Sequence, residues 1–421
     1  MVPVHPITND ERANVVTVPP GGFLYQRYMH LTGVRAYRAA NDGGVYLDAL
    51  AARDLSRHTY LASSVRVVCP MIDAADPPPG TVRFAQPGFE FVALPHGTKV
   101  LPYLLGGGWL RSVWTVWRQL GWADVAFLGF VEHPIPYGWT AAPFAALRKV
   151  PWYTFIESSP WRVPKGVRAK RRDRVRAFVT ERINRRLFRR ATFAFISQPA
   201  YAAFLRSGCP HLVSPASWFL HDEMATSAQI ASARAEAETR RPHLMYVGRL
   251  DPFKGIDVLV AALSNLDAAG VALRFTIMGA GRPQASIEQL AMSLRNVQLA
   301  VAPPVLYGPD FFTALRGADA LVVPNLSDEQ PRNVFDAFSQ AVPVLASDTT
   351  GLRSIVTDRV DGQLLPVGDV AALADAMAAF VDPAVRAQWR QRGDAGYERA
   401  AGYDHDMMHA QRADFIANLG G

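Results

Sequence analysis

The chain has 421 residues, of which 49% are hydrophobic and 19% charged, a globular composition that is too apolar for a disordered protein. At about 100–200 residues per domain, this length favours two or three domains. The net charge of +7 is too small and too local for a nucleic-acid-binding protein, which carries a basic face or a recognisable module. The only cysteines are Cys69 and Cys209, which excludes a disulfide framework and a four-cysteine zinc site and fits a reducing cytoplasm.

Three features of the whole chain bear on its location. No run of about 18 apolar residues occurs, so no membrane-spanning helix is expected. The first residues, MVPVHPITNDERANVV, lack a basic stretch followed by an apolar one, which predicts no secretory signal. The excess of positive charge lies between Arg162 and Arg190, where thirteen basic residues accompany two acids. We therefore expect a cytoplasmic, mildly acidic protein with one basic segment.

In the first half of the chain, short apolar runs alternate with helical patterns. Strands of this length separated by helices are typical of a parallel sheet built from βαβ units. The sequence therefore predicts a Rossmann-like domain over residues 1–222. Its expected helices are 44–58 and 109–121, and its expected strands are 64–70, 89–95, 124–130, 152–156 and 192–197.

The second half shows the same alternation more clearly. Residues 223–241 are polar and rich in alanine and arginine, and we expect a hinge region there. A second Rossmann-like domain is predicted over 242–400, and a helix over about 402–421 is expected to pack back onto the first domain. The expected strands of the second domain are 244–248, 273–279, 297–301, 320–324 and 342–347.

Two such domains joined by a hinge place a cleft between the carboxyl ends of two sheets. In open α/β folds, ligands bind at these ends. The predicted fold class is therefore α/β, with two Rossmann-like domains facing across a cleft. Functional residues are expected in the loops that follow strands.

The segment GRLDPFKG, residues 248–255, follows a predicted strand and leads directly into a helix. A helix N-terminus offers free backbone N–H groups and the positive end of the helix dipole. Arg249 and Lys254 would add two cations there, and Lys254 is the last lysine of the chain. The segment predicts a diphosphate site, although an ordinary loop with two solvated charges would have the same sequence.

A second loop, PNLSDEQPRN at residues 324–333, joins a predicted strand to a helix that carries Asp336. Acids at the start of a helix complement its dipole, so capping explains Asp328 and Glu329 as well as ligand binding does. Capping does not explain Asp336, which lies further inside the helix. Its carboxylate could accept hydrogen bonds from the hydroxyl groups of a ligand.

These two motifs belong to a longer ordered series. The series YVGRLDPFKGIDVLVAAL, IMGAG and ADALVVPNLSDEQPRNVFDAFSQAVPVLASDTTGLRSIVTDRVDGQLLPVGDVAAL resembles the donor domain of the retaining glycosyltransferases of family 4, the glycosyl transferases group 1. The resemblance is close over 243–382 and holds only in outline over the first half. It implies the GT-B fold, with an acceptor-binding first domain and a nucleotide-sugar donor-binding second domain.

The resemblance also implies an activity. A hexosyltransferase of this family moves a sugar, with retention, from a nucleotide-diphosphate-sugar to a hydroxyl of a lipid-linked or polysaccharide acceptor, as in cell-envelope polysaccharide biosynthesis. No protein nucleophile, metal or other cofactor is then expected, and the nucleotide-sugar is a substrate. The nucleotide base, the sugar and the acceptor stay open.

The resemblance assigns roles to residues of the second domain. Arg249 and Lys254 match the pair that holds the donor pyrophosphate in place of a metal. Asp328 matches an acid that contacts the sugar, and Asp336 matches one that contacts the ribose hydroxyls. The other positions carried over to the donor site are Gly248, Gly279 and Gly281 near the nucleotide, and Glu329, Gln330, Arg332 and Asn333 in the loop that cradles the sugar.

The sequence departs from the family pattern at this loop. Asp328 and Asp336 stand where the family has glutamates, each one methylene longer. Glu329 could replace Asp328 at a spacing shorter by one residue. Arg332 adds a cation that would favour a negatively charged donor, or it is a surface arginine paired with Glu329 or Asp328.

The first domain offers candidates for the acceptor or sugar side. Glu132 and His133 follow one predicted strand, and Glu157 follows the next. His133 and Glu157 are the catalytic candidates among them, although a lone histidine is as often structural. Gly43 and Gly44 precede the first predicted helix and resemble the glycine turn of the family, where close backbone approach requires a residue without Cβ.

The basic segment predicts an amphipathic helix whose apolar side chains recur on one face. Such a helix can bind an anionic membrane surface, and we expect its stripe to pack on the sheet while its arginines face lipid at the inner side of the cell membrane. The alternative is a solvated arginine face. The apolar stripe is Val175, Phe178, Val179, Ile183 and Leu187. The candidate lipid contacts are Arg171, Arg172, Arg182, Arg185 and Arg186. Four tryptophans either support an interfacial location or belong to the core: Trp109, Trp114, Trp117 and Trp122.

Three other functions stay open on the sequence alone. A nucleotide-sugar epimerase would use Glu132, His133 and Glu157 for proton transfer. A non-catalytic GT-B nucleotide-sugar-binding protein would explain the two shortened acids. A dinucleotide oxidoreductase is disfavoured because Gln284 stands where the third glycine of its fingerprint is required.

Overall fold

The computed structural model describes residues 23–97, 99–130, 135–164, 167 and 169–419. The chain divides into two compact units, Met1–Pro151 and Trp152–Gly421, which are described separately. The boundary between the units lies inside the first predicted domain, so the predicted limits 1–222, 223–241 and 242–400 stay a prediction.

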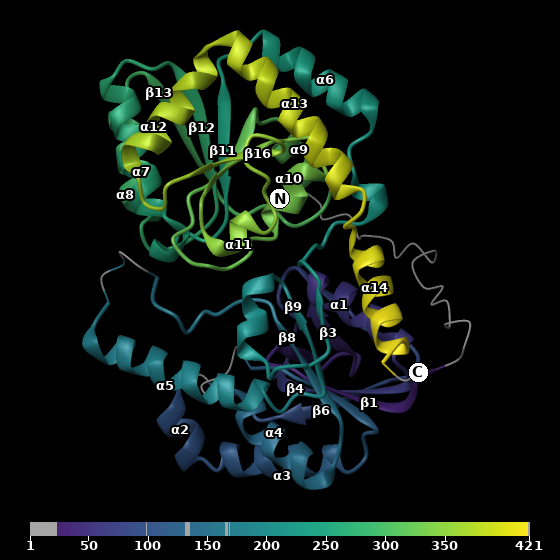
Figure 1. The fold of residues 1–421 in the computed structure, drawn as a ribbon. Coiled ribbons are helices and arrows are strands. Elements are labelled where there is room, and N and C mark those ends of the chain that lie inside the picture. The colour runs from purple at the N-terminus through teal and green to yellow at the C-terminus, as the bar shows by residue number, and fades with distance from the viewer. Residues whose placement is uncertain (1–22, 98, 131–134, 165–166, 168, 420–421) are drawn as a thin grey trace. The chain divides into compact units, whose positions relative to one another are not determined.

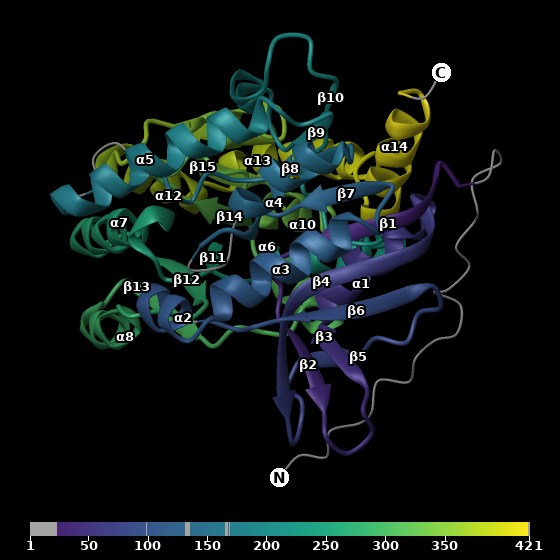
Figure 2. The ribbon, with the colours of Figure 1, turned by 90° about the horizontal axis from the view of Figure 1, so that it is seen from below.

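The sheet of unit 1 is built around β4, a strand of thirteen residues (Ala62–Ala74). Its first half lies parallel to β1 (Tyr25–Leu31) and β6 (Phe89–Leu94), and β1 also pairs with β7 (Val125–Leu128). Its second half pairs with β2, from which β3 and β5 continue in antiparallel order. These last strands form the projecting part of unit 1 in Figure 2 and are β2 (Ala36–Ala39), β3 (Val45–Asp48) and β5 (Thr81–Arg83).

The predicted helix over 44–58 is wrong in its first part. Residues Val45–Asp48 form β3, and helix α1 (Ala49–Ser56) begins only afterwards. The Asp48 carboxylate fixes this start, because it accepts hydrogen bonds from the backbone N–H groups of Leu50 and Ala51. The other helices of unit 1 are the 3-10 helix η2 (Arg57–Tyr60), α2 (Val100–Leu105), α3 (Gly108–Leu120) and α4 (Tyr137–Arg148).

Unit 2 begins with a small parallel sheet, β8 (Trp152–Ile156), β9 (Phe193–Ile196) and β10 (His211–Val213). Helix α5 (Arg171–Phe188) connects β8 to β9. The C-terminal helix α14 (His405–Ala417) packs against these strands. The Arg412 guanidinium lies 4.5 Å from the ring centroid of Phe155, and the ring of Phe415 lies 5.9 Å from that of Phe195.

The larger sheet of unit 2 has six parallel strands in the order β13-β12-β11-β14-β15-β16. In chain order this is 3-2-1-4-5-6, the doubly wound Rossmann arrangement. The strand order therefore reverses between β11 and β14, which makes the carboxyl ends of these two strands the expected ligand position. The strands are β11 (His243–Val247), β12 (Leu273–Met278), β13 (Val297–Ala302), β14 (Ala320–Val323), β15 (Val344–Ser347) and β16 (Gly362–Leu365).

Helices cover both faces of this sheet, as Figure 1 shows. One face packs on α7, α8 and α12, with Trp389 of α13 in the same core. The other face packs on α9, α10 and α11. Strands covered on both faces read as apolar runs, which is why the sequence predicts five of the six; β16 is the strand that it misses. The helices are α7 (Ile256–Ala268), α8 (Gln284–Ser293), α9 (Pro309–Arg316), α10 (Asn333–Phe338), α11 (Thr350–Arg353), α12 (Val370–Ala378) and α13 (Pro383–Ala400).

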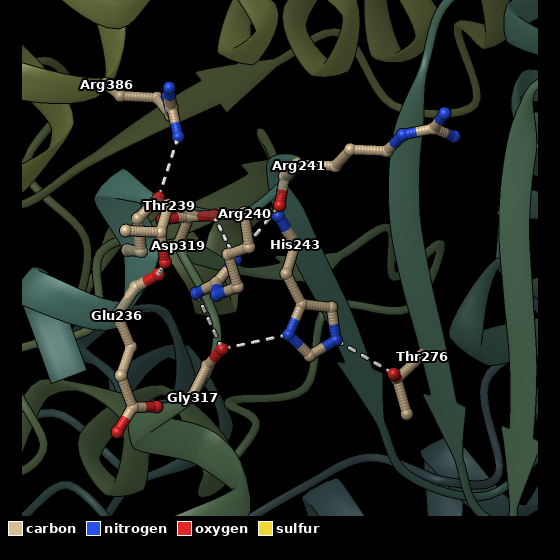
Figure 3. A network of polar contacts seen from close by, with 10 residues as sticks. Glu236, Thr239, Arg240, Arg241, His243, Thr276, Gly317, Asp319 and Arg386 are labelled. Atoms are coloured by element: carbon tan, nitrogen blue, oxygen red, sulfur yellow. Dashed lines mark hydrogen bonds and ion pairs between the residues drawn. The ribbon is translucent and has the colours of Figure 1, made fainter.

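The segment 223–241, expected as a hinge region, contains helix α6 (Ser227–Glu238). Thr226 caps this helix by accepting a hydrogen bond from the N–H of Gln229, whose side chain accepts one from Thr226 N–H in return. The chain then enters β11 through the contacts drawn in Figure 3. There the Arg240 guanidinium donates to Asp319 and to the carbonyl of Gly317.

His243 lies in the middle of this network. Its two ring nitrogens bond the Gly317 carbonyl and the Thr276 hydroxyl, both at 2.8 Å (Figure 3). Burial lowers the pKa of His243 and outweighs the opposing effect of the Gly317 carbonyl. In unit 1, burial and the neighbouring His58 lower the pKa of His30 well below its usual value. Both histidines are therefore neutral in the folded chain near pH 7.

We expect these two histidines to make the folded chain less stable in mild acid. The unfolded chain binds a proton as the pH falls below about 6.5, whereas the folded chain does not, so the stability present above that pH is progressively lost below it. Thermal unfolding between pH 5 and pH 8 measures this loss. His30→Gln should flatten the pH dependence, and the exposed His211 provides the control substitution His211→Gln. An unchanged slope in His30→Gln would contradict the assignment.

Candidate functional site

A cavity of about 840 Å³ lies in unit 2. One wall consists of the loops that follow β11, β14 and β15. The other wall consists of the segment after β8 and the first half of α5. It therefore lies at the position where the strand order of the six-stranded sheet reverses. The polar residues that line it are Ser159, Arg162, Arg174, Glu181, Arg249, Asp251, Lys254, Ser327, Asp328, Glu329, Asp348, Thr349 and Thr350.

The cationic part of the cavity comes from the loop between β11 and α7. Arg249 is exposed, and its carbonyl accepts a hydrogen bond of 2.6 Å from the buried hydroxyl of Tyr246. Lys254 ends the short 3-10 helix η5 (Pro252–Lys254), directly before α7. Its ammonium group pairs with the carboxylate of Glu329. The structure thus brings both predicted diphosphate residues to one cavity, beside the N-terminus of a thirteen-residue helix.

Gly255 fixes the direction in which this loop enters α7. Its φ is 74°, in the left-handed region, and a Cβ atom there would lie 1.8 Å from the carbonyl oxygen of Pro324. The residue therefore must be glycine for the Lys254 loop to lie against the end of β14. The sequence shows this glycine within the motif but does not indicate its partner, because Pro324 is remote in the chain.

Gly279 and Gly281, the two glycines expected near the nucleotide, are also required by the packing of the backbone. A Cβ atom at Gly279 would lie 1.9 Å from the carbonyl oxygen of Gly248, and one at Gly281 would lie 2.3 Å from that of Leu250. The N–H of Leu250 donates to the carbonyl of Ala280 at 3.0 Å. The turn after β12 therefore packs backbone to backbone on the Arg249 loop, and the glycines hold that loop in position.

The Asp328 loop is held by two segments, the one that follows β9 and the start of α11. Its backbone carbonyl accepts a hydrogen bond of 2.6 Å from the side chain of Gln198. The N–H of Thr350 lies 3.4 Å from the Asp328 carboxylate. A Cβ atom at Gly351 would lie 2.3 Å from the carbonyl oxygen of Glu329, so this glycine lets the start of α11 approach the loop. Gln198 and Gly351 are positioning residues that the sequence does not single out.

Gln330 and Asn333 bond to the protein itself. The Gln330 side chain accepts from the N–H of Ala216 at 3.1 Å and donates to the carbonyl of Ser197 at 3.0 Å. The Asn333 amide donates to the carbonyl of Val247 at 2.8 Å. Both side chains therefore fasten the loop before α10 to other parts of unit 2, in addition to any role of the backbone toward a ligand.

Arg332 pairs with neither of the acids expected for it. Its Nε lies 4.0 Å from the carboxylate of Glu157, and its guanidinium lies 4.6 Å from the ring centroid of Trp218. The structure thus brings together two predicted site residues, Glu157 from the end of β8 and Arg332 from the donor-side loop. Neither is among the described residues that line the cavity.

Asp336 lies apart from the other acids. Its side chain is buried, and it accepts a hydrogen bond of 2.6 Å from the hydroxyl of Tyr307. It is not among the described residues that line the cavity, whereas Asp328 is. The two aspartates that match the acid pair of the family therefore have different surroundings in this structure.

Two further sets of candidates remain. Glu132 and His133 fall outside the described residues. Gly43 and Gly44 lie in unit 1, in the turn between β2 and β3 rather than directly before a helix. Gly43 has a φ of 63°, and the N–H of Gly44 donates to the Asp42 carboxylate at 2.8 Å. These contacts explain the glycine pair as a hairpin turn.

Helix α5 forms a wall of the cavity, which the sequence does not indicate. The expected packing of its apolar stripe on the sheet is wrong for the first half of the helix, where Val175, Phe178 and Val179 are exposed. Phe178 lines the cavity instead. Only near its end does the stripe become buried, at Leu187. The periodicity identifies an apolar face correctly but does not reveal what covers it.

Glu181 organises the cavity side of α5. Its carboxylate accepts hydrogen bonds from Trp161 at 2.6 Å, Arg162 at 2.5 Å and Arg185 at 2.7 Å. Burial alone would raise the pKa of Glu181, but the hydrogen bonds from these three side chains, led by Arg162, outweigh it and lower the pKa to about 2. Both arginines also stack on Phe204, at 4.8 and 4.5 Å. Arg162 is thereby fixed at the cavity wall.

We expect Glu181→Gln to lower the free energy of unfolding by about 1–3 kcal/mol, because the variant leaves charged hydrogen-bond donors without an anion. Chemical denaturation at pH 7 measures this. The control is Glu90→Gln, which breaks an exposed ion pair with Arg66 and should cost less than about 1 kcal/mol. Equal losses in the two variants would contradict the organising role of Glu181.

The predicted lipid-facing residues differ in their surroundings. Arg171, Arg172, Arg182 and Arg186 are exposed, whereas Arg185 is engaged with Glu181 and Phe204. Among the tryptophans, Trp114 is exposed, Trp117 stacks under Arg148 at 3.8 Å, and Trp122 lies under Arg66 at 4.1 Å. Over the part of the chain that the structure describes, no helix combines the length and apolarity needed to cross a bilayer.

Residues 241–382 match the family described as glycosyl transferases group 1. A D-inositol 3-phosphate glycosyltransferase of Nocardia farcinica is 33% identical over 193 residues, which cover 43% of this chain and 40% of that protein. A phosphatidyl-myo-inositol mannosyltransferase of Mycobacterium leprae is 28% identical over 193 residues, covering 45% of this chain and 49% of that protein. The chain thus spans less than half the length of these two relatives.

Solved structures match over almost the whole chain. A sucrose-phosphate synthase from Thermosynechococcus elongatus has a TM-score of 0.69 at 19% identity, covering 94% of this chain and 99% of that one. HepE from Anabaena, in complex with UDP-glucose, has a TM-score of 0.62 at 14% identity, covering 93% and 100%. At these identities the likeness establishes the fold. Residues 241–382 therefore belong to the glycosyl transferases group 1 family, and the chain has the GT-B fold, as the sequence predicts.

Proposed function

We propose that the chain is a retaining glycosyltransferase. It moves a hexose-type sugar from a nucleotide-diphosphate-sugar to a hydroxyl group of a lipid-linked or glycan acceptor. The observation that carries the proposal is the meeting of Arg249 and Lys254 with Asp328 in one cavity, at the point where the Rossmann strand order reverses. These residues lie within the part of the chain that matches the family.

The chemistry of the site supports a reaction without a metal ion. Arg249, Lys254 and the N-terminus of α7 offer two full positive charges and free backbone N–H groups to a diphosphate. Such groups stabilise the negative charge that develops on the leaving nucleotide. Glu329 now pairs with Lys254, so donor binding would replace a carboxylate by a phosphate at the same ammonium group.

In the proposed reaction the acceptor oxygen attacks the anomeric carbon on the face that the nucleotide leaves. The bond between the anomeric carbon and the phosphate oxygen breaks, the bond to the acceptor oxygen forms, and the acceptor proton passes to the departing phosphate oxygen. The configuration of the sugar is therefore retained, and no protein nucleophile takes part. Asp328 is proposed to bind a hydroxyl group of the sugar.

A transfer assay tests this proposal. The chain is incubated in EDTA with UDP-, GDP-, ADP- and dTDP-sugars and a hydroxyl acceptor, and NMR records the anomeric configuration of the product. The names of the relatives suggest inositol phosphate as the first acceptor, and the HepE complex suggests UDP-glucose as the first donor. The expected result is a product with the anomeric configuration of the donor. An inverted product, or transfer only after addition of a divalent metal, would contradict the proposal.

The second candidate function is that of a non-catalytic nucleotide-sugar-binding protein. The surroundings of Asp336 favour this function. Its carboxylate is buried and bonded to Tyr307, so it is not free in this structure to hold ribose hydroxyls. If the chain is such a protein, we expect it to bind a nucleotide without transferring sugar to any acceptor in the same assay. Tyr307→Phe separates the two: it should strengthen donor binding if Asp336 contacts the ribose, and leave it unchanged otherwise.

The proposed cellular location is the cytoplasm, at the inner face of the cell membrane. The exposed arginines of α5 are proposed to contact anionic lipid, where each such cation adds about 1 kcal/mol. Reversing the charges of Arg171, Arg172 and Arg186 should release the chain from anionic vesicles in a sedimentation assay. Arg185 is left unchanged because Glu181 holds it. Unaltered sedimentation of the variant would exclude this role of α5.

A further inference from the structure

Unit 2 contains a second, smaller cavity, with a volume of about 40 Å³. It lies between α6, the end of α9, the turn before β15 and α13. None of the described residues that line it also lines the first cavity. We call it the arginine cavity, because arginine dominates its charged lining. The charged residues that line it are Arg234, Arg240, Arg316, Arg386, Arg390 and Asp319.

The guanidinium groups of two of these arginines lie at the cavity itself, since their hydrogen-bond partners line it as well. Arg316, the last residue of α9, donates to the side-chain oxygen of Gln340. Arg386 of α13 donates to the carbonyl of Ala237 at 3.1 Å (Figure 3). Gln340 and Ala237 both line the arginine cavity. The charged ends of two side chains, from two different helices, therefore meet at one small space.

The charges around the arginine cavity are not balanced. Three of its arginines have a carboxylate partner. These pairs are Arg240 with Asp319, Arg234 with Asp394 and Arg390 with Glu238. The side chains of Asp394 and Glu238 are 54% and 58% exposed, so solvent screens both of these anions. Five guanidinium groups and three carboxylates leave two positive charges in excess.

Arg316 and Arg386 carry this excess, because neither forms an ion pair with any residue in the described part of the chain. A guanidinium has five N–H donors. Arg316 shares its donors between Gln340 and Thr313, and burial lowers its pKa from the ordinary value. The Nε of Arg386 is buried without an acceptor. A buried donor of this kind is costly and marks the place of a missing partner.

The size of the cavity limits what that partner can be. A site needs at least about 10–15 Å³ to hold one water molecule, so the arginine cavity has room for a group the size of a few waters. A phosphate group meets this limit, whereas a sugar or a nucleotide base exceeds it. The planar guanidinium also matches the geometry of phosphate oxygens, which it binds through two parallel N–H groups.

We propose that the arginine cavity binds a phosphate group. The phosphate supplies the anion that Arg316 and Arg386 lack, and it thereby connects α9 to α13. The ligand is inorganic phosphate, or a phosphomonoester whose ester group extends into solvent past the partly exposed side chains of Arg234 and Arg390. The inference goes beyond the proposed function and does not rest on it, since the two cavities share no described lining residue.

The alternative is a network of ion pairs whose role is only structural. Two of the pairs do join α6 to α13, since Arg234 and Glu238 lie on α6 and their partners Asp394 and Arg390 lie on α13. Such a network explains these four residues. It does not explain two further cations at the same cavity, or a buried guanidinium nitrogen without an acceptor.

Calorimetric titration of the full chain with inorganic phosphate, at constant ionic strength, tests the inference. Phosphate can also enter the first cavity, so Lys254→Met is titrated beside the wild type. The test variant is Arg316→Gln/Arg386→Gln. The control is Arg295→Gln/Arg359→Gln, which removes two exposed arginines of unit 2 that line neither cavity. Loss of two charged donors should weaken phosphate binding about a hundred-fold.

The expected result is a phosphate site that persists in Lys254→Met and in the control, and that is about a hundred-fold weaker in the test variant. Loss of all phosphate binding in Lys254→Met would overturn the inference, because phosphate would then occupy only the first cavity. Equal affinity of the test variant and the control would overturn it too. A parallel titration with glucose 6-phosphate distinguishes the two sources of the phosphate group, since the tighter ligand identifies the source.

A variant with the opposite expected effect separates binding from a loss of folding. Glu238→Gln removes an exposed carboxylate and frees Arg390, so it should tighten phosphate binding several-fold. A purely structural network predicts lower stability and no gain in affinity. Unchanged or weaker phosphate binding by Glu238→Gln, with its circular dichroism spectrum intact, would therefore contradict the inference.

Discussion

Lys254→Met should reduce kcat/KM for sugar transfer by about a thousand-fold, equivalent to roughly 4 kcal/mol of transition-state stabilisation. The ammonium group is largely shielded from solvent, with 18% of its side chain exposed, and it stands beside the N-terminus of α7. Removing it takes away charge where the leaving diphosphate becomes more negative. Steady-state kinetics with the donor identified by the transfer assay measure the loss.

The partner of Lys254 provides the matched control. Glu329→Gln keeps the ammonium group but removes the carboxylate that now occupies it. It should bind the nucleoside diphosphate more tightly than the wild type, because the phosphate no longer competes with Glu329. Full activity of Lys254→Met with an unchanged melting temperature would contradict the assignment of the diphosphate site.

Gly255→Ala should destabilise unit 2 by about 3–5 kcal/mol, the range of a substitution that forces a backbone shift at a strained position. The added Cβ atom would lie 1.8 Å from the carbonyl oxygen of Pro324, so either the Lys254 loop or the end of β14 must move. Thermal unfolding gives the loss of stability, and donor binding should weaken with it because the same loop carries Lys254.

Gly270→Ala is the matched control at the other end of α7. Gly270 has a φ of 75°, nearly that of Gly255, but no atom lies within 4 Å of a Cβ atom there. This variant should therefore cost only the conformational strain of about 1 kcal/mol. Equal destabilisation of the two variants would show that the φ angle, and not the close approach to Pro324, makes Gly255 necessary.

Five strands of the six-stranded sheet could be predicted because each reads as an apolar run, whereas β16, whose sequence is GQLL, was not predicted. β1 could not, since its sequence YQRYMHL begins with exposed polar side chains and resembles a loop. β3 was hidden inside a helical pattern because a four-residue strand shows little periodicity. Asp48 marks the boundary between β3 and α1 in the sequence, because its side chain caps the helix.

The cavity could be predicted on the donor side only. Arg249, Lys254 and Asp328 each follow a strand of a recognisable doubly wound sheet, and the parallel topology brings such positions together. Arg162 and Gln198 could not be found in this way, because their contacts with Glu181 and Asp328 join segments that are distant in sequence. Asp336 was a candidate from the sequence, but its partner was not, since the Tyr307 hydroxyl that donates to it is contributed by a different loop.

A thermal-shift panel with UDP, GDP, ADP, CMP and dTDP, each alone and as a sugar conjugate and without added metal, tests the donor site directly. A ligand at about 100 times its dissociation constant adds roughly 2.7 kcal/mol of stability. We expect a clear rise in melting temperature with one nucleotide and no such rise in Lys254→Met. No shift with any of them, or a shift that persists in Lys254→Met, would contradict the donor site proposed at this cavity.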